Sequence, residues 1–276
     1  MIDDKTICVI GAGAMGGALC RGLVSAGAAA AESIYVSDAH AAHVEALRAT
    51  LGIKVAATNI EAARRADILV LAVKPYNVDL VLREIAGELA REGGASLPLL
   101  VSIAAGYPLA KLEAHCAGPV PVIRAMPNTP AQVGKGACAF CRGAHAGDAH
   151  AAQAMAIFNS VGTAVEVPES MMDAVTALSG SGPAYIYLMI EALIDGGVKA
   201  GLPRDTAHQL AAQTVLGAAQ MVIETGMHPA QLRDMVTTPA GTTIEAIAAL
   251  EHSGLRAALI DAVGRAAARS RELGAQ

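Results

Sequence analysis

The residues with the clearest chemical purpose are three glycines near the start of the chain. They form the pattern Gly-x-Gly-x-x-Gly at Gly11, Gly13 and Gly16, directly after the apolar run Thr6–Ile10. In a strand–turn–helix unit, the first glycine permits a tight turn, the second lets the backbone approach a pyrophosphate, and the third lets helix and strand pack closely. A helix expected over 15–26 would offer its N-terminal N–H groups to the phosphates. We therefore expect a dinucleotide site here.

A second predicted strand, Ser33–Ser37, follows at the distance expected of a strand–helix–strand unit and leads into Asp38. An acidic residue at this place normally binds the ribose 2′-OH and repels a 2′-phosphate, which favours NAD. No arginine directly follows Asp38, although Ser37, Asn59 or a nearby helix end could hold a 2′-phosphate. The residues leave NADH and NADPH both open.

Three loop-like clusters follow later strands of the first half. Ala72–Pro75 ends a predicted strand, where ligands of open α/β sheets bind, so Lys74 is placed to meet a phosphate or ribose. Small residues in Ser102–Gly106 would let a cofactor lie against the backbone. In Met126–Pro130, two prolines fix the backbone and Asn128 can hydrogen-bond a carboxamide or a substrate oxygen; a rigid structural turn is the alternative.

Two hydroxyl-rich segments lie in the second half. Leu178–Tyr185 combines serines and glycines with Pro183, and we expect it to open a helix; Thr237–Thr243 precedes a later helix. Such helix starts resemble anion sites, and two of them together suggest a pocket for a small carboxylate. Ordinary N-capping by Ser and Thr is the alternative.

The pattern of predicted secondary structure changes near Pro168. Before it, short β-rich runs alternate with helical segments, which predicts parallel pairing and a doubly wound sheet. The further strands are expected at 54–56, 68–73, 99–103, 120–124, 137–140 and 164–167. After it, helices are expected at 184–199, 204–224, 229–236, 243–251 and 255–272. The predicted fold is α/β: an N-terminal doubly wound Rossmann domain over 1–168, followed by an all-α dimerisation domain over 169–276.

The apolar helices of the second half predict an oligomer. The segment 207–222 is apolar on more than one face, and such a helix must be buried. Because this half is short, burial against a second copy of the chain is the economical explanation. We therefore expect a homo-oligomer formed through the C-terminal helices.

Composition excludes several classes of function. A net charge of -5 without a basic run argues against nucleic acid as a partner. Charges or prolines interrupt each apolar stretch before it reaches the length of a membrane span, and the N-terminus lacks a signal-peptide pattern. We expect a cytoplasmic protein with no membrane partner.

The cysteines and histidines suggest neither a disulfide framework nor a metal site. The five cysteines are an odd number, and Cys138 and Cys141 would point to opposite faces of a strand. No cluster of metal ligands and no strong general base is evident, so we expect no metal. This suits a reaction whose hard step is carried by the cofactor.

Together and in this order, these motifs resemble the pyrroline-5-carboxylate reductase family. The most specific segment is Asp173–Tyr185, and Gly241–Ile244, Ala72–Pro75 and Met126–Pro130 support it at matching separations. The resemblance covers nearly the whole chain. Ala240 is one departure, because the family often has a second glycine there.

The resemblance implies hydride transfer from NADPH or NADH to the ring C=N carbon of 1-pyrroline-5-carboxylate, which gives L-proline in the last step of proline biosynthesis. It also implies a homodimer, often assembled further into a decamer. The cofactor contacts that it implies are Ile10, Gly11, Ala12, Gly13, Ala14, Met15, Asp38, Asn59, Ala72, Val73, Lys74, Pro75, Ile103, Ala104, Ala105 and Asn128. The substrate contacts that it implies are Glu169, Ser181, Thr242 and Thr243, with Thr243 as the catalytic residue that hydrogen-bonds the ring nitrogen.

Two other readings compete. The first is a β-hydroxyacid dehydrogenase or imine reductase, which usually employs a lysine on its helical domain. Lys199 is the only lysine after Lys135, and its place near a helix C-terminus favours charge–dipole stabilisation instead. The second is a cofactor-binding regulatory protein without turnover.

Overall fold

The chain forms two compact units. In the computed structural model, which describes residues 2, 4–90 and 97–274, one unit comprises Met1–Ser181 with Ala266–Gln276 and the other comprises Gly182–Arg265. Compactness therefore groups 169–181 with the first unit. The boundary at residue 168 between a dinucleotide-binding domain and a dimerisation domain stays a prediction.

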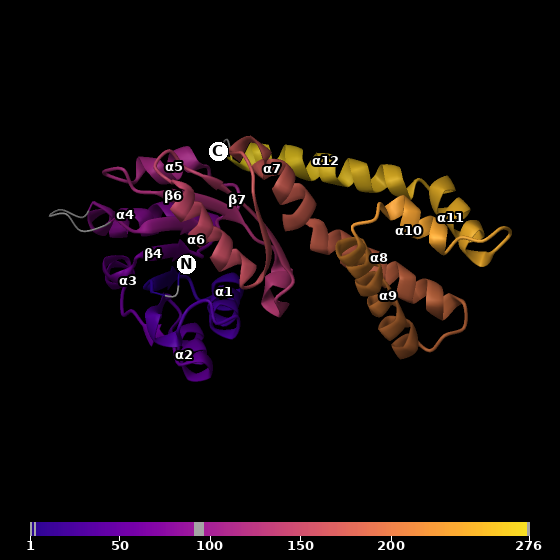
Figure 1. Cartoon of the computed structure of the whole chain (residues 1–276), viewed down its shortest axis with the longest axis horizontal. Helices are drawn as coiled ribbons and strands as arrows, with labels where there is room; N and C mark the ends of the chain where they lie inside the picture. Colours follow the sequence, from indigo (N-terminus) through magenta and orange to yellow (C-terminus); the bar gives the residue numbers. More distant parts are fainter. Residues whose placement is uncertain (1, 3, 91–96, 275–276) are drawn as a thin grey trace. The chain divides into compact units, whose positions relative to one another are not determined.

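The first unit is built on one eight-stranded sheet, whose strand order is β3-β2-β1-β4-β5-β6-β7-β8 (Figure 1). The strands are β1 (Ile7–Ile10), β2 (Ile34–Ser37), β3 (Lys54–Val55), β4 (Ile68–Leu71), β5 (Leu99–Ser102), β6 (Val122–Met126), β7 (Gly136–Arg142) and β8 (Gly162–Glu166). Each overlaps a strand expected from the sequence, and β1 to β6 pair in parallel. The order of the chain reverses between β1 and β4, which is where open α/β sheets bind ligands.

The expectation of parallel pairing throughout is wrong at one place, because β6 and β7 pair antiparallel. Their connection contains only the 3-10 turn Thr129–Val133, and a parallel return would need a longer crossover. The chain therefore folds back on itself. Helix α6 (Asp148–Asn159) then allows β8 to lie parallel to β7.

Helices cover both faces of the sheet, which confirms the doubly wound fold. Alternating strand residues such as Val9 and Ile10 belong to two different hydrophobic clusters. The first cluster includes residues of α1 (Ala14–Ser25), α2 (Ala41–Leu51) and α6. The second includes residues of α3 (Asn59–Arg65), α4 (Val78–Leu89), α5 (Leu109–Ala114) and α7 (Met172–Val175).

The cysteines behave as expected from the alternation of a strand. Cys138 belongs to one hydrophobic cluster and Cys141 to the other, so they lie on opposite faces of β7. Burial raises the pKa of Cys141 to about 12 and also that of Cys20 to about 12. These side chains are therefore inert thiols at neutral pH.

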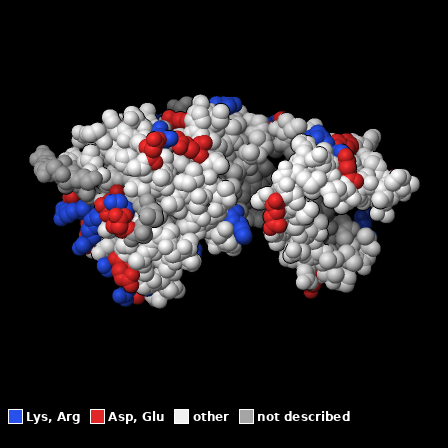
Figure 2. Space-filling model, in the orientation of Figure 1, with Lys and Arg blue, Asp and Glu red and all other residues white. Residues whose placement is uncertain are grey.

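The second unit is helical. It contains α8 (Gly182–Lys199), α9 (Arg204–Thr225), α10 (Pro229–Met235), α11 (Thr242–His252) and the first part of α12 (Leu255–Gly274). Among the described residues of this unit, only Ala207 and Ala211 are fully buried. Many large apolar side chains stay exposed, and on the face drawn in Figure 2 this unit carries few charged groups. Its apolar surface calls for a covering partner.

One helical run is longer and less interrupted than the sequence suggested. Glu169–Lys199 is long and apolar enough to cross a membrane by length and composition, and little of it is buried. The expectation that prolines or charges break every apolar stretch fails here because Pro183 lies in the first turn of α8, where proline is tolerated. Its exposed apolar side chains are of the kind that a protein partner covers.

A pair of helical glycines tests the packing of α1. A Cβ added at Gly22 would collide with the Val161 side chain and lie 2.8 Å from the Ser160 carbonyl oxygen, whereas one added at Gly87 in α4 meets nothing within 4 Å. We expect Gly22→Ala to lower the free energy of unfolding by about 2 kcal/mol through overpacking. Gly87→Ala should raise it by about 0.5–1 kcal/mol through helix propensity. Urea unfolding of both variants measures the difference, and equal stabilities would contradict the described packing.

Candidate functional site

The glycine loop after β1 is shaped by close backbone approaches. Gly11 has a φ of 106°, and a Cβ there would lie 2.6 Å from the carbonyl oxygen of Ala72, so only glycine fits. A Cβ at Gly16 would collide with the carbonyl oxygen of Gly11. At Gly13, by contrast, a Cβ would meet nothing within 4 Å. Two glycines therefore close the turn, and the third leaves open space of the kind a pyrophosphate needs.

The start of α1 supplies donors to this space. Its N-cap, Gly13, provides no side-chain cap, and no acidic residue lies in the first turn. The first N–H groups of a helix have no partner within the helix, and here the ladder begins with Gly17 N–H donating to Gly13 O at 2.8 Å. The N–H groups of Ala14 and Met15 and the positive end of the helix dipole can therefore hold an anion.

Asp38 anchors this loop to the end of β2. Its Oδ2 accepts a hydrogen bond from the Ala12 N–H at 2.6 Å, and its Oδ1 accepts one from the His40 N–H at 2.7 Å. Burial alone would raise the pKa of Asp38, but these N–H groups, with the imidazoles of His40 and His43, hold it below its ordinary value. The carboxylate is therefore charged, largely enclosed and engaged with backbone.

Two other residues named for the adenosine side form a chain of hydrogen bonds. The Ser37 Oγ donates to Asn59 Oδ1 at 2.9 Å, and Asn59 Nδ2 donates to Glu84 Oε2 at 2.8 Å. Asn59 is the first residue of α3, and Ser37 directly precedes Asp38. The structure thus brings Ser37, Asp38 and Asn59 to one corner of the sheet, beyond the end of β2.

The loops after β4 and β5 continue the same edge. Ala72 N–H donates to Ile10 O at 2.8 Å, and Ile103 N–H donates to Leu71 O at 3.1 Å. Lys74 is exposed, and Ala104 is buried. The segments Ala72–Pro75 and Ile103–Ala105 therefore lie side by side next to the glycine loop.

Asn128 has both ends of its amide engaged. Its Nδ2 donates to Ser179 O at 2.9 Å, and its Oδ1 accepts from the Ala137 N–H at 2.9 Å. It thus ties the start of β7 to the π-helical turn Thr176–Gly180. Single π turns in helices are frequent at functional sites. Asn128 positions this turn; its predicted place near the nicotinamide stays a prediction.

The expectation that Leu178–Tyr185 opens a helix is confirmed, since α8 begins at Gly182. The π turn Thr176–Gly180 comes shortly before this start, and the Ser181 N–H donates to Thr176 O at 2.8 Å. The Ser181 N–H is therefore already engaged with backbone. The sequence did not indicate the π turn.

The expectation for Thr237–Thr243 is confirmed, since α11 begins at Thr242. Its N-cap, Gly241, offers no side-chain cap, which leaves N–H groups of Thr242 and Thr243 without a capping side chain. Ala240 just before it has a φ of 54°. The residue that departs from the family glycine thus occupies the left-handed region, where an alanine is strained.

Glu169 lies in an ion pair within the first unit. Its Oε1 accepts from Leu109 N–H at 2.8 Å and from Arg124 Nη1 at 2.9 Å, and the Arg124 side chain is only 9% exposed. Its predicted contact with substrate stays a prediction. Arg124 was not anticipated as a partner, although an arginine inside an apolar strand was a signal of it.

Two side-chain clusters were also missed. Asp79 Oδ1 accepts from Tyr107 Oη at 2.6 Å and lies 2.9 Å from His115 Nε2, which joins the start of α4 to the residues on both sides of α5. Beyond β2, Asp38, His40 and His43 bring one potential ligand atom each to within 4.8 Å of one another. Because both Asp38 oxygens accept backbone N–H groups, we do not identify these residues as metal ligands.

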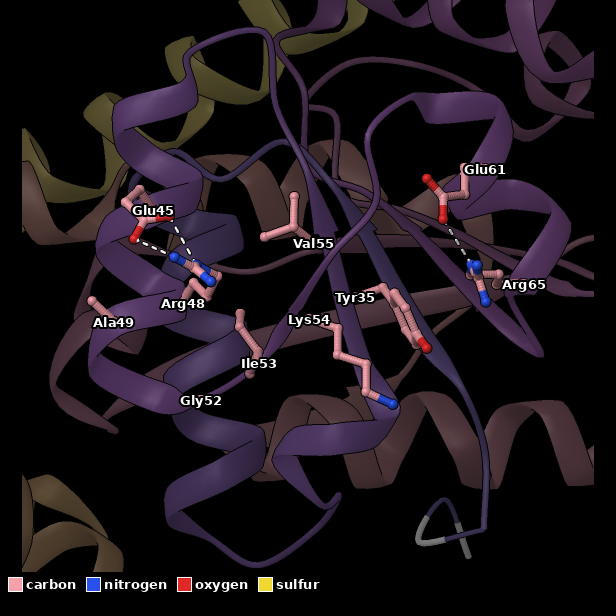
Figure 3. Close-up of a pocket in the computed structure, with 10 residues that line it drawn as sticks. All are labelled: Tyr35, Glu45, Arg48, Ala49, Gly52, Ile53, Lys54, Val55, Glu61 and Arg65. Atoms are coloured by element: carbon pink, nitrogen blue, oxygen red, sulfur yellow. Dashed lines mark hydrogen bonds and ion pairs between the residues drawn. The ribbon is translucent and has the colours of Figure 1, made fainter.

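A separate hollow lies at the β2–β3 edge and contains none of the predicted site residues (Figure 3). Lys54 Nζ and the Arg65 guanidinium each lie 5.3 Å from the ring centroid of Tyr35. Arg65 is also paired with Glu61, and Arg48 with Glu45. The basic groups here already have partners.

Both parts of the chain match known protein families. Residues 169–273 match the family model "Pyrroline-5-carboxylate reductase dimerisation". Residues 6–106 match the model "NADP oxidoreductase coenzyme F420-dependent".

Whole-chain relatives point the same way. A pyrroline-5-carboxylate reductase of Methanosarcina acetivorans is 49% identical over 273 residues, which cover 99% of each chain. One from Synechocystis is 48% identical, with 96% of this chain and 97% of the relative covered.

Solved structures agree with these relatives. A pyrroline-5-carboxylate reductase of Coxiella burnetii superposes with a TM-score of 0.92 at 35% identity, covering 98% of each chain. A pyrroline carboxylate reductase of Plasmodium falciparum, solved with NADP bound, superposes with a TM-score of 0.86 at 33% identity, covering 99% of each chain. With a glycine loop fit for a pyrophosphate and relatives of this identity along its whole length, the chain belongs to the pyrroline-5-carboxylate reductase family.

Proposed function

We propose that this chain reduces 1-pyrroline-5-carboxylate to L-proline with NADPH or NADH, the last step of proline biosynthesis. The observation that carries the proposal is a glycine loop that fits a pyrophosphate, in a chain similar over its whole length to reductases of this name. The dinucleotide supplies the hydride when bound. The protein's own contribution is to bind, orient and exclude water.

The cofactor contacts proposed here all come from segments at or after the carboxyl ends of the strands β1 to β6. Ile10–Met15 hold the pyrophosphate through the N–H groups at the start of α1. Asp38 and Asn59 lie at the adenosine ribose, and Ala72–Pro75 and Ile103–Ala105 line the remainder. Asn128 lies near the nicotinamide and holds the π turn in place.

The substrate contacts proposed are Glu169, Ser181, Thr242 and Thr243. The Thr243 hydroxyl hydrogen-bonds the ring nitrogen and relays a proton from solvent, while N–H groups at the start of α11 hold the carboxylate. A cyclic imine that is partly protonated in water needs no stronger acid. Orientation of the C=N carbon at about 3–3.5 Å from the reactive carbon of the cofactor supplies most of the rate.

The second unit supports a homo-oligomer, a dimer that can assemble further into a decamer. Leu188 on α8 has 68% of its surface exposed, and Ile223 on α9 has 81%. Covering such side chains with a second copy of the chain removes apolar area from water, at about 25 cal/mol for each Å². We propose a cytoplasmic enzyme whose partners are its substrate and its own copies, without nucleic acid or membrane.

Removal of the open space at Gly13 tests the cofactor site and the activity together. The wild-type protein should oxidise NADPH or NADH only when 1-pyrroline-5-carboxylate is added, and should reduce the oxidised cofactor with proline at high pH. Gly13→Ala should keep wild-type thermal stability, because its Cβ meets no protein atom within 4 Å, yet bind the dinucleotide at least about tenfold more weakly. Cofactor binding without any turnover of either substrate would support the regulatory alternative.

Truncation of one hydroxyl tests the catalytic residue. Thr243→Ala should lower kcat by about 10- to 100-fold and leave cofactor affinity unchanged, because it removes a proton relay and not a nucleotide contact. Steady-state kinetics with both substrates measure the split. Thr242→Ala is the neighbouring control, expected to raise KM more than it lowers kcat. Wild-type kcat in Thr243→Ala would remove this residue from the mechanism.

A matched pair of exposed leucines tests the oligomer. Leu188→Glu on α8 places a charge on the proposed interface and should dissociate the oligomer in sedimentation experiments. Leu80→Glu on α4 changes an equally exposed leucine, at 69%, in the first unit and should leave it intact. A stable wild-type monomer at micromolar concentration would contradict the proposed interface.

A further inference from the structure

Two histidines beyond β2 have no role in the reaction as proposed. His40 is the N-cap of α2, and His43 lies within the first turn of that helix. Their side chains are 76% and 51% exposed, and their ring centroids lie 5.2 Å apart. Both Nδ1 atoms face the same carboxylate oxygen, Asp38 Oδ1, at 3.2 Å and 3.8 Å. The two exposed imidazoles thus lie next to the largely buried carboxylate of Asp38.

The Asp38 carboxylate makes contacts with backbone N–H groups that differ from the usual role of an acid at this position. In a dinucleotide site, an acid at this place is expected to bind the ribose 2′-OH and to repel a 2′-phosphate. Here its side chain is only 12% exposed, and one oxygen accepts from the Ala12 N–H of the glycine loop. The groups presented to solvent beside it are imidazoles. The negative charge of Asp38 is therefore accompanied by two exposed imidazoles that can offset it.

The other candidates for a 2′-phosphate are less suited. Ser37 Oγ donates to Asn59, and Asn59 Nδ2 donates to Glu84, whose negative charge opposes an anion. On α2, Arg48 is paired with Glu45. On α1, the Arg21 side chain lies beside Gly17. Arg21 is not among the groups that lower the pKa of Asp38, whereas His40 and His43 are. The start of α2 adds uncapped N–H groups, without an acidic residue in its first turn.

We propose that His40 and His43, when protonated, bind the 2′-phosphate of NADP(H), so that the choice between NADP(H) and NAD(H) depends on pH. The inference rests on the proposed function, because it assigns one end of the cofactor of that reaction. When both imidazoles are protonated, their two positive charges outweigh the single charge of Asp38 and attract the phosphate. When they are neutral, the charge of Asp38 remains, and NAD(H) is favoured.

The sign of the effect follows from the three groups involved. Asp38 stays ionised from pH 6.5 to 8.5, since its pKa lies below its ordinary value. A phosphate monoester is mostly a dianion over the same range, because its second pKa is about 6. Histidine is the side chain whose ordinary charge change falls in this region. A selectivity that changes with pH here therefore reports on the imidazoles.

Binding measurements without substrate test the proposal directly. Calorimetric titration of the full-length protein with NADP⁺ and with NAD⁺, in EDTA and at pH 6.5 and 8.5, gives both affinities. We expect NADP⁺ to bind about tenfold more weakly at the higher pH and NAD⁺ to change by less than about twofold. Titrations in buffers of different ionisation enthalpy should show proton uptake with NADP⁺ only.

Three variants sharpen the result. In the double variant His40→Gln and His43→Gln, the pH dependence and the proton uptake should vanish, while NAD⁺ affinity stays at the wild-type value. His145→Gln changes an exposed histidine between β7 and α6 and should behave as wild type. Asp38→Asn should tighten NADP⁺ at pH 8.5.

The outcomes separate the two claims. A preference between NADP⁺ and NAD⁺ that is independent of pH, or that survives in the double variant, overturns this inference and leaves the reductase proposal standing, provided that 1-pyrroline-5-carboxylate is reduced. A protein that binds neither dinucleotide overturns both. A pH effect that appears only when EDTA is omitted would assign the histidines to a metal and overturn the phosphate site.

Discussion

The rest of the structure depends on the close approach of the glycine turn to the end of the neighbouring strand. Gly11 follows β1 with a positive φ, and its missing side chain allows the Ala72 carbonyl after β4 to come within van der Waals contact. Gly16 then allows α1 to pack directly on that turn. Any larger residue would push α1 off the sheet and move the N–H groups at its start. The anion site that we propose therefore depends on the close packing of backbone on backbone between the ends of β1 and β4.

Side-chain clamps extend this rigidity to the neighbouring loops. Asp38 ties the end of β2 to the glycine loop through the Ala12 N–H, and Asn128 ties β7 to the π turn through Ser179. Glu169, which follows β8, ties this part of the chain to Arg124 on β6 and to Leu109 at the start of α5. In each case a polar side chain satisfies buried backbone or a buried charge, so each clamp is costly to break. These hydrogen bonds fix the loops from which the proposed ligand contacts come.

Much of the first unit could be predicted from the sequence because its signals are local. Glycine spacing and apolar runs such as that of β4 each reflect the immediate backbone. What failed had two causes. The π turn at Thr176–Gly180 has a distant partner, since Asn128 donates to Ser179 O. The antiparallel pairing of β7 follows from the short connection after β6, which the alternation of strands and helices does not indicate. The pairing of Asp38 with His40 and His43 came only from the structure, together with the contact between Asp38 and the Ala12 N–H.

The central claim is that the N-terminus of α1, opened by Gly13 and fixed by Gly11 and Gly16, holds the pyrophosphate of the cofactor. A crystal structure of the protein with NADP⁺ tests it most directly. We expect pyrophosphate oxygens within hydrogen-bond distance of the N–H groups of Ala14 and Met15, with the adenosine directed toward Asp38. A dinucleotide bound elsewhere, or one whose phosphates make no contact with these N–H groups, would contradict it.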